Sequence, residues 1–308
     1  MKKKIIIIIL VLLLSGCTQY NDINNISIIS SISIEKENKN YLVNLKVLSS
    51  NQENKDNIYS QTCTKLYECF DAFNNQLMKK LYLTHLDLLV LSNNLEKEDY
   101  DNIVNFFINQ KTSRNSFNTI IAETPQDILN YNTKDISNLL DLSIKTTGIV
   151  KKISFDEIIK DILNYKITYI PYINRNIEIN SYKEIYEENK ILSKDESLAI
   201  NIIKNNINNI TLLINKETYK LEECNTINKV NKDNITFNIE CNYKGKKENI
   251  ELIKNYFNTI INQLIENNNN NYIKYLIHKY TNKEPKKIKH SIKLNIKHYK
   301  DTGGEIFE

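Results

Sequence analysis

The stretch Leu81–Leu91, which reads LYLTHLDLLVL, is the segment that decides the fold. Its apolar residues are nearly continuous, which is typical of a strand that is covered on both faces of a sheet. We therefore expect Leu86, Leu88 and Val90 to be buried in such a strand. His85 interrupts the run, and a histidine in this setting is more often a core or subunit-contact residue than a catalytic base.

The elements around this strand alternate between strands and helices. Upstream, two β-rich runs joined by a polar turn predict a hairpin, and a helix follows, at residues 26–34, 41–48 and 62–80. Downstream, we expect a helix, a strand and a short helix opened by proline, at residues 97–110, 117–123 and from Thr124-Pro125 onward. Proline is well accommodated at the first position of a helix.

The middle of the chain carries two helix-start signals. Ser154 with Glu157 and Ser193 with Glu196 have the spacing of capping boxes, and apolar residues with helical periodicity follow each pair. Between them, residues 167–173 read as a strand. Its Pro171 predicts an edge strand or a strand end, because proline cannot donate a backbone hydrogen bond to a neighbour.

The last hundred residues predict a second region of mixed structure. We expect short strands and turns, a long helix, a second helix and a final strand, at residues 211–241, 247–266, 271–280 and 290–297. There is no strict βαβ repeat, so the order predicts an α+β fold with three modules of mixed sheet flanked by helices. We expect a signal peptide at 1–16, an N-terminal domain at 17–145, a middle domain at 146–207 and a C-terminal domain at 208–308.

The first seventeen residues predict a lipid anchor. Three lysines precede the ten-residue apolar run Ile5–Leu14, which as a helix spans only about 15 Å and is too short to cross a bilayer. Leu14-Ser15-Gly16-Cys17 follows and resembles a bacterial lipobox. Cys17 is therefore the expected site of lipidation, after which its acyl chains hold the mature protein on the extracytoplasmic side of a membrane.

Four cysteines remain after Cys17, namely Cys63, Cys69, Cys224 and Cys241. Outside the cytoplasm they are able to form disulfides, with three possible pairings. Cys63 and Cys69 fall on one predicted helix and, six residues apart, are expected to pair poorly. Cys224 and Cys241 fall on neighbouring predicted strands and pair if the register allows, while four buried free thiols are an equally good reading.

Charge and motifs argue against several classes of protein. The net charge of +4 includes Lys2, Lys3 and Lys4, so the mature chain carries about +1, and there are only two arginines. This is unlike a nucleic-acid-binding protein. No phosphate-binding glycine loop, hydrolase elbow or metal-ligand spacing occurs, so we expect no metal and no cofactor. The motifs give no support to an enzymatic activity, although a catalytic triad can be assembled from residues that are distant in sequence.

The remaining histidines and a cluster of lysines lie near the C-terminus. His278, His290 and His298 are scattered, and the last two share a strand face with apolar residues. The neighbouring lysines suit either a solvated face or a contact with anionic lipid headgroups. These are Lys283, Lys286, Lys287 and Lys289.

Four stretches together resemble the Ger(x)C family of spore germination lipoproteins. The lipobox cysteine is followed by the hairpin at 26–50, and Lys80–Leu91 is followed by a helix and then by Arg114-Asn115 and Ala122–Leu129. Residues 154–171 resemble the middle segment of the family. The C-terminal helices, Pro285 and the strand that ends at Thr302-Gly303 resemble its last domain.

This resemblance implies a role in spores of an endospore-forming bacterium. The chain would be the lipid-anchored, non-enzymatic C subunit of a nutrient germinant receptor at the spore inner membrane, beside integral-membrane A- and B-type subunits. The alternative is a lipid-anchored solute-binding protein that feeds a transporter, which would need two similar lobes around a polar cleft. A structure with unlike domains and no such cleft distinguishes the first class from the second.

Overall fold

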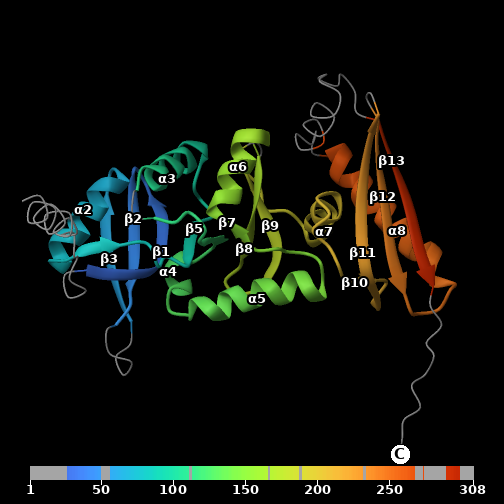
Figure 1. Ribbon diagram of the computed structural model, residues 1–308, viewed down its shortest axis with the longest axis horizontal. Coiled ribbons are helices and arrows are strands. Elements are labelled where there is room, and N and C mark those ends of the chain that lie inside the picture. Colours follow the sequence, from blue (N-terminus) through green and yellow to red (C-terminus); the bar gives the residue numbers. More distant parts are fainter. Residues whose placement is uncertain are drawn as a thin grey trace, which may run out of the picture.

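The computed structural model describes residues 26–49, 56–110, 113–165, 167–186, 189–231, 234–267, 273 and 289–298. These residues form an α+β molecule with two mixed sheets, a nine-stranded one at the N-terminal end and a four-stranded one at the opposite end (Figure 1). The predicted fold class is confirmed. Two sheets are formed where we expected three.

The first sheet has the strand order β3-β2-β1-β5-β6-β8-β9, with β4 beside β1 and β7 beside β6. Its centre is parallel, because β1, β5, β6 and β8 all run in the same direction. On one side β2 pairs antiparallel with β1 and β3 pairs antiparallel with β2, and on the other side β9 pairs antiparallel with β8. The strands are β1 (Ile26–Glu37), β2 (Asn40–Val47), β3 (Asn57–Cys63), β4 (Lys80–Tyr82), β5 (Leu88–Ser92), β6 (Asn118–Ala122), β7 (Ile153–Ser154), β8 (Thr168–Ile173) and β9 (Ile179–Ile185).

The apolar run that we read as one strand forms two short ones. A turn at Thr84 and His85 separates β4 from β5, and both strands pair in parallel with β1. Leu88 and Val90 are buried in β5 as predicted, whereas Leu86 is buried but precedes the strand. β5 is covered on both faces: Leu88 and Val90 pack into one core, and the alternate residues Leu89 and Leu91 pack into the other.

Helices cover the two faces of this sheet. One face packs against α2 (Leu66–Leu77), α3 (Lys97–Asn109) and α6 (Phe155–Tyr165), with the buried rings of Phe73, Phe107 and Phe155. The other face packs against α4 (Pro125–Ile128), α5 (Thr133–Thr146) and α7 (Lys194–Ile203). This second core continues without a break into the C-terminal sheet, so the two sheets share one hydrophobic interior.

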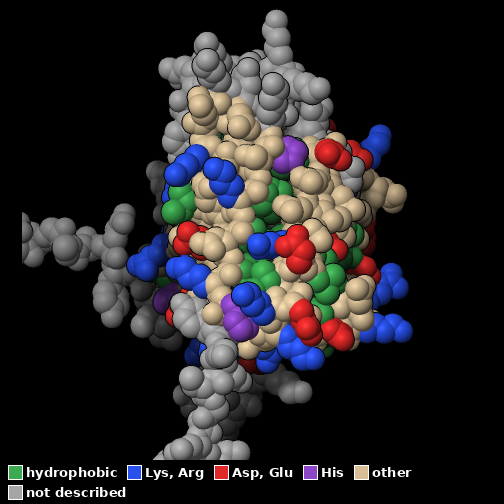
Figure 2. Space-filling view, turned by 90° about the vertical axis from the view of Figure 1, so that its right-hand side faces the viewer, with side chains coloured by type: hydrophobic (Ala, Val, Ile, Leu, Met, Phe, Trp, Pro, Cys, Tyr) green, Lys and Arg blue, Asp and Glu red, His purple; other side chains and the backbone are tan. Residues whose placement is uncertain are grey.

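The second sheet has the order β10-β11-β12-β13. Its strands are β10 (Ile210–Ile214), β11 (Glu217–Asn231), β12 (Asn234–Tyr243) and β13 (Lys289–His298), and α8 (Asn249–Asn267) packs against one face. The alternation along β12 buries Ile235, Phe237 and Ile239. Figure 2 views this end of the molecule, where lysines and carboxylates are scattered among uncharged polar side chains.

Residues of the expected middle domain contribute strands to the first sheet. β8 pairs in parallel with β6 through Ile121 with Tyr172 and Ala122 with Ile173, which satisfies backbone groups that β6 would otherwise leave unpaired. Segments on both sides of residue 145 therefore contribute to the first sheet, and the predicted cut at 145 falls inside α5. The cut at 207 falls just before β10. As domain boundaries, both cuts stay predictions.

Several individual elements differ from the sequence-based expectation. The helix expected from residue 62 begins at Leu66, because residues 57–63 form β3 at the edge of the sheet. β8 is an interior strand in spite of Pro171, but β6 pairs only with the two residues that follow this proline. Short strands were expected at 211–241; β10 is short, with five residues, whereas β11 and β12 are long hairpin arms of 15 and 10 residues. The helix expected at 271–280 lies outside the described residues.

Candidate functional site

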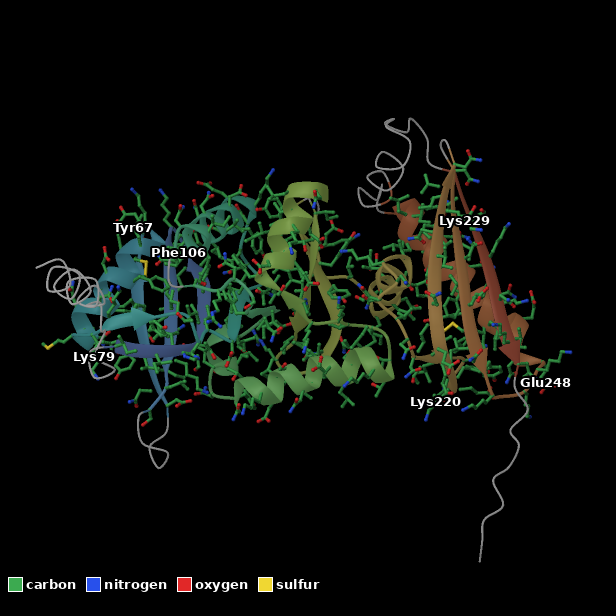
Figure 3. All side chains as sticks on the ribbon, viewed as in Figure 1. Tyr67, Lys79, Phe106, Lys220, Lys229 and Glu248 are labelled. Carbon is green, nitrogen blue, oxygen red and sulfur yellow. A yellow bond between two sulfur atoms is a disulfide. The ribbon has the colours of Figure 1, made fainter. Side chains whose placement is uncertain are left out.

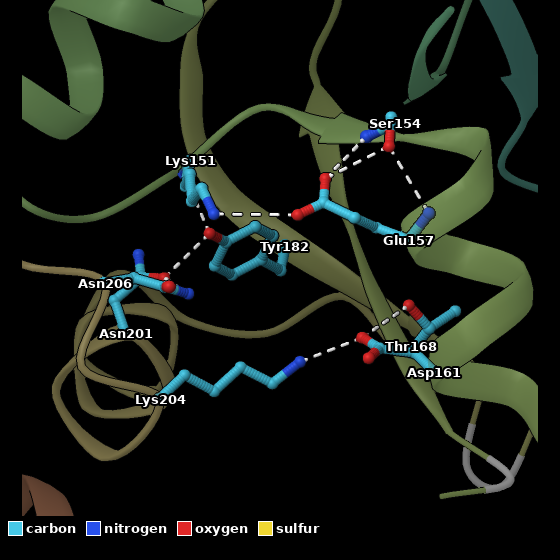
Figure 4. A network of polar contacts seen from close by, with 9 residues as sticks. All are labelled: Lys151, Ser154, Glu157, Asp161, Thr168, Tyr182, Asn201, Lys204 and Asn206. Carbon is cyan, nitrogen blue, oxygen red and sulfur yellow. Dashed lines mark hydrogen bonds and ion pairs between the residues drawn. The ribbon is translucent and has the colours of Figure 1, made fainter. Parts of the chain in front are cut away.

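A polar pocket of about 340 Å³ lies between α6 and α7, beside the edge strand β9 (Figure 4). α6 and α7 each begin at a capping box, so local sequence fixes where both walls of the pocket start. The lining residues are Lys151, Lys152, Ile153, Glu157, Lys160, Asp161, Asn164, Tyr169, Tyr182, Ile200, Asn201, Lys204 and Asn206.

A chain of buried hydrogen bonds joins β9 to α7 at this pocket. The Tyr182 hydroxyl donates to the side-chain oxygen of Asn201 at 2.9 Å and accepts from the backbone N–H of Lys151 at 2.7 Å. The Asn201 amide nitrogen donates to the backbone oxygens of Gly148 and Ile149 at 2.9 and 2.7 Å. Burial raises the pKa of the Tyr182 phenol to about 12, so the phenol is neutral at physiological pH.

Two ion pairs extend these contacts to α6. The Lys204 ammonium on α7 lies 3.0 Å from a carboxylate oxygen of Asp161 on α6, and both side chains are mostly buried. Lys151 lies 3.7 Å from Glu157, which also accepts from the backbone N–H and hydroxyl of Ser154. Both carboxylates of the pocket therefore already have cationic partners within the protein. The arrangement holds α6, α7 and β9 in a fixed geometry.

Lysine, amide and phenol groups dominate the lining of the pocket. Two hydroxyl groups donate to its carboxylates, Ser154 to Glu157 at 3.2 Å and Thr168 to Asp161 at 3.3 Å. Within the described ranges, no group of three or more His, Cys, Asp and Glu side chains is placed to hold a metal ion. The pocket carries four lysines and two carboxylates, so any ligand that it takes would be anionic or zwitterionic.

Lys183 is a buried lysine outside this pocket. Lys183 on β9 is 3% exposed, and its ammonium donates a hydrogen bond to the backbone oxygen of Asn93, just after β5. Burial lowers the pKa of Lys183 to about 8. Neither this lysine nor the Tyr182–Asn201 pair was predicted from the sequence, because each contact joins residues far apart in the chain and no local motif marks them.

The histidines that the sequence singled out are dispersed. His85 lies exposed in the turn before β5, so its placement in a strand and its interpretation as a core residue were wrong, and a subunit-contact role stays a prediction. On β13, His290 Nε2 lies 2.7 Å from the side-chain oxygen of Asn262 on α8, and burial lowers its pKa. His298 Nε2 lies 2.7 Å from the backbone oxygen of Gly245. His278 lies outside the described residues, as do Cys17 and three of the four C-terminal lysines.

All four cysteines after Cys17 form disulfides. Cys63 bonds to Cys69, which corrects the expectation that they pair poorly: Cys63 ends β3 and Cys69 lies on the first turn of α2, so they face each other across a strand–helix junction. Cys224 bonds to Cys241 between β11 and β12. A bulge after Glu222 brings these two residues opposite each other, which settles the question of register that the sequence left open.

Among the helices of the described ranges, none combines the length and the apolar character needed to span a bilayer. No curated protein matches the chain. A solved structure described as "Crystal Structure of the GerBC protein" is similar with a TM-score of 0.48 and 13% sequence identity, covering 87% of this chain and 96% of that one.

The sequence pattern of the family described as "Spore germination protein N-terminal domain" matches residues 19–175. This range extends from before β1 to just beyond β8, so it contains the parallel centre of the nine-stranded sheet and the helices that cover one face of it. Because the match covers half of the sequence, it identifies the family directly: this chain belongs to the Ger(x)C family of spore germination proteins.

Proposed function

We propose that this protein is the lipid-anchored, non-enzymatic C subunit of a nutrient germinant receptor. In this proposal acyl chains on Cys17 hold it on the extracytoplasmic side of the spore inner membrane, beside integral-membrane A- and B-type subunits. The observation that carries the proposal is the match of residues 19–175 to the spore germination family. The resemblance of the remaining segments to the same family supports it.

Two features of the chain support an extracytoplasmic position. The first is the sequence of the first seventeen residues, in which a positive segment, a ten-residue apolar run and a lipobox end at Cys17. The second is the pair of disulfides, Cys63–Cys69 and Cys224–Cys241. Structural disulfides are common in oxidising compartments outside the cytoplasm and rare within it.

The architecture supports a subunit that acts through contact. A solute-binding protein closes two similar lobes around its ligand. Here the two sheets are unlike, with nine strands of mixed direction in one and four in the other. The polar groups of the pocket bond to one another, as Tyr182 with Asn201 and Lys204 with Asp161 illustrate. These observations favour the receptor subunit over the solute-binding protein.

The experiment that tests this proposal is deletion of the gene in the host, in a strain without a paralogue. We expect nutrient-triggered germination to slow markedly, while germination by agents that bypass receptors is unchanged. Re-expression of the full chain should restore the response. A secreted chain that begins at Thr18 should fold but fail to restore it, because it is no longer concentrated beside its partners. A normal nutrient response in the deletion strain contradicts the proposal and favours the solute-binding alternative.

A further inference from the structure

The start of β1 lies beside the turn that joins α2 to β4. In the parallel pairing of β1 with β4, Ile26 is opposite Lys80 and Ser27 is opposite Leu81. The first described residue is therefore one strand spacing, about 5 Å, from the end of that turn. We call Met78, Lys79 and Lys80 the α2–β4 tip.

The length of chain before Ile26 limits how far this tip can be from a lipid anchor. Eight residues lie between Cys17 and Ile26, which makes nine residue-to-residue steps, and a fully extended chain spans at most about 3.3–3.6 Å per step, or roughly 30 Å in all. If Cys17 carries the acyl chains, the tip must lie within that distance of the membrane surface. The four-stranded sheet lies at the opposite end of the molecule (Figure 1).

The tip has the chemistry of a membrane contact. Met78 is 91% exposed, which is unusual for a large apolar side chain, and it occupies the C-cap of α2 with a φ of 49°. That left-handed conformation favours glycine or asparagine, so the position is a costly one for methionine. A flexible thioether held outward in this way is suited to enter the interfacial layer of a bilayer.

The charge around the tip suits an anionic surface. Lys79 and Lys80 are both exposed, and they follow the C-terminal end of α2, where cations are favoured by the helix dipole. No Asp or Glu occurs from residue 72 to residue 86, although Asp71 lines the adjoining groove together with Lys80. Lysines close to an anionic membrane surface add to its attraction for a protein.

Aromatic residues extend the same surface. A groove of about 340 Å³ between α2 and α3 shares Asn74 and Lys80 with the hollow at the tip. Tyr67 is 53% exposed at this groove, and Phe106 also lines it. Figure 3 shows both at the same end of the molecule as Lys79, while Lys220, Lys229 and Glu248 lie at the far end. Tyrosine and other aromatic rings are favoured at the level of lipid headgroups.

We propose that the α2–β4 tip is the surface with which this protein rests on an anionic lipid bilayer. Met78 enters the interfacial layer, and Lys79 and Lys80 contact headgroup phosphates. The proposal rests on the anchoring of the chain at Cys17 and adds an orientation to it. The nine-stranded sheet is then proximal to the membrane, and the open face of the four-stranded sheet is directed away from it.

The test uses the full lipidated chain, reconstituted in vesicles of 70% phosphatidylcholine and 30% phosphatidylglycerol. Met78→Cys and, as a matched control, Leu213→Cys each introduce one exposed thiol for an environment-sensitive fluorophore. Leu213 is 69% exposed on β10, in the sheet at the far end. The other cysteines are in disulfides or, at Cys17, acylated, so the label is specific. Lipids that carry a nitroxide near the headgroup quench the fluorescence of a label that contacts the bilayer surface, so the degree of quenching measures that contact.

We expect at least a threefold greater quenching of the label at position 78 than of the label at position 213. Lys79→Glu with Lys80→Glu should reduce that ratio toward one, whereas Lys220→Glu with Lys229→Glu should leave it unchanged. Equal quenching of both labels on protein that stays with the vesicles overturns the orientation and leaves the anchor intact. Protein that leaves the vesicles overturns the anchor itself, and the tip proposal with it.

Discussion

The hydroxyl of Tyr182 donates a 2.9 Å hydrogen bond to the side-chain oxygen of Asn201, and this contact fixes α7 against the edge strand β9. Both side chains are buried, and the same hydroxyl accepts from the backbone N–H of Lys151. Since α7 also packs against α8, the contact holds the position at which the two sheets meet. The Tyr182–Asn201 hydrogen bond therefore lies between the polar pocket and the hydrophobic core that the two sheets share.

Tyr182→Phe should destabilise the protein by about 1–3 kcal/mol. The change keeps the ring in place but leaves the Lys151 N–H without its acceptor and weakens the set of bonds to Asn201. Urea unfolding followed by circular dichroism measures the loss. Tyr67→Phe is the matched control, because Tyr67 is exposed, and it should change the free energy of unfolding by less than about 0.5 kcal/mol. Equal effects of the two changes would contradict the role of the buried hydroxyl.

Removal of either disulfide should destabilise the protein, and the longer loop should account for the larger loss. The separation of 17 residues between Cys224 and Cys241 corresponds to about 3 kcal/mol, and the separation of six between Cys63 and Cys69 to about 2 kcal/mol, in the chain-entropy description. Paired Cys→Ala variants, unfolded by heat with and without dithiothreitol, measure both losses. In the variant that lacks both bonds, dithiothreitol should have no further effect. If dithiothreitol does not change the thermal stability of the wild-type protein, the disulfides do not contribute to its stability and the prediction is wrong.

The stability of the protein should rise with pH on account of Lys183. Burial lowers its pKa from 10.5 to about 8, so between these two values the unfolded chain binds more protons than the folded one. The free energy of unfolding contributed by this group is therefore constant below about pH 8 and increases by roughly 1–3 kcal/mol up to about pH 10.5.

Comparison with Lys183→Met isolates this contribution, because other titrating groups cancel in the difference. The difference in unfolding free energy between wild type and variant should shift in favour of the wild type from pH 7 to pH 10. Lys79→Met, at an exposed lysine, should show no such shift. A pH-independent difference for Lys183→Met would mean that the ammonium is solvated in the folded state.

Cys17→Ala should abolish lipid labelling and move the protein out of the membrane fraction. Cys17 is the one residue in the lipobox position, and its thiol is the expected acceptor of the diacylglycerol. Metabolic labelling with a radioactive fatty acid, followed by membrane fractionation, measures both effects. Ser15→Ala, which keeps a small residue before the cysteine, is the control and should be labelled normally. Full labelling of the Cys17→Ala variant contradicts the lipoprotein assignment.

Elements defined by local chemistry could be predicted from the sequence. Both capping boxes form as expected: Ser154 with Glu157 and Ser193 with Glu196 exchange the two hydrogen bonds of the motif. The long amphipathic helix α8 and the final strand β13 also lie where their periodicity indicates. In each case the signal lies within one short segment of chain.

Elements that depend on distant partners could not be predicted. β3 is polar and lacks a clear alternation, because it is an edge strand that only pairs with β2. α5 buries only Ile136 and Leu140 and leaves Leu139 and Leu142 exposed, so its pattern is weak. The pocket forms from residues of β9 and α7 that no motif connects. The sequence located the walls of that pocket, but not the contacts between them.

The parallel pairing of β12 with β13 has a consequence for the growing polypeptide. All ten residues of β13 pair with β12, yet the fifty-five residues from 244 to 298 must be synthesised after β12 before that pairing is complete. At about 5–20 residues per second, the ribosome needs roughly 3–11 s to add them. Throughout that interval the hydrogen-bonding edge of β12 is open to any other extended chain. The nascent protein is therefore most vulnerable to aggregation just before its last strand emerges, and a factor that shields β12 at that moment should raise its yield.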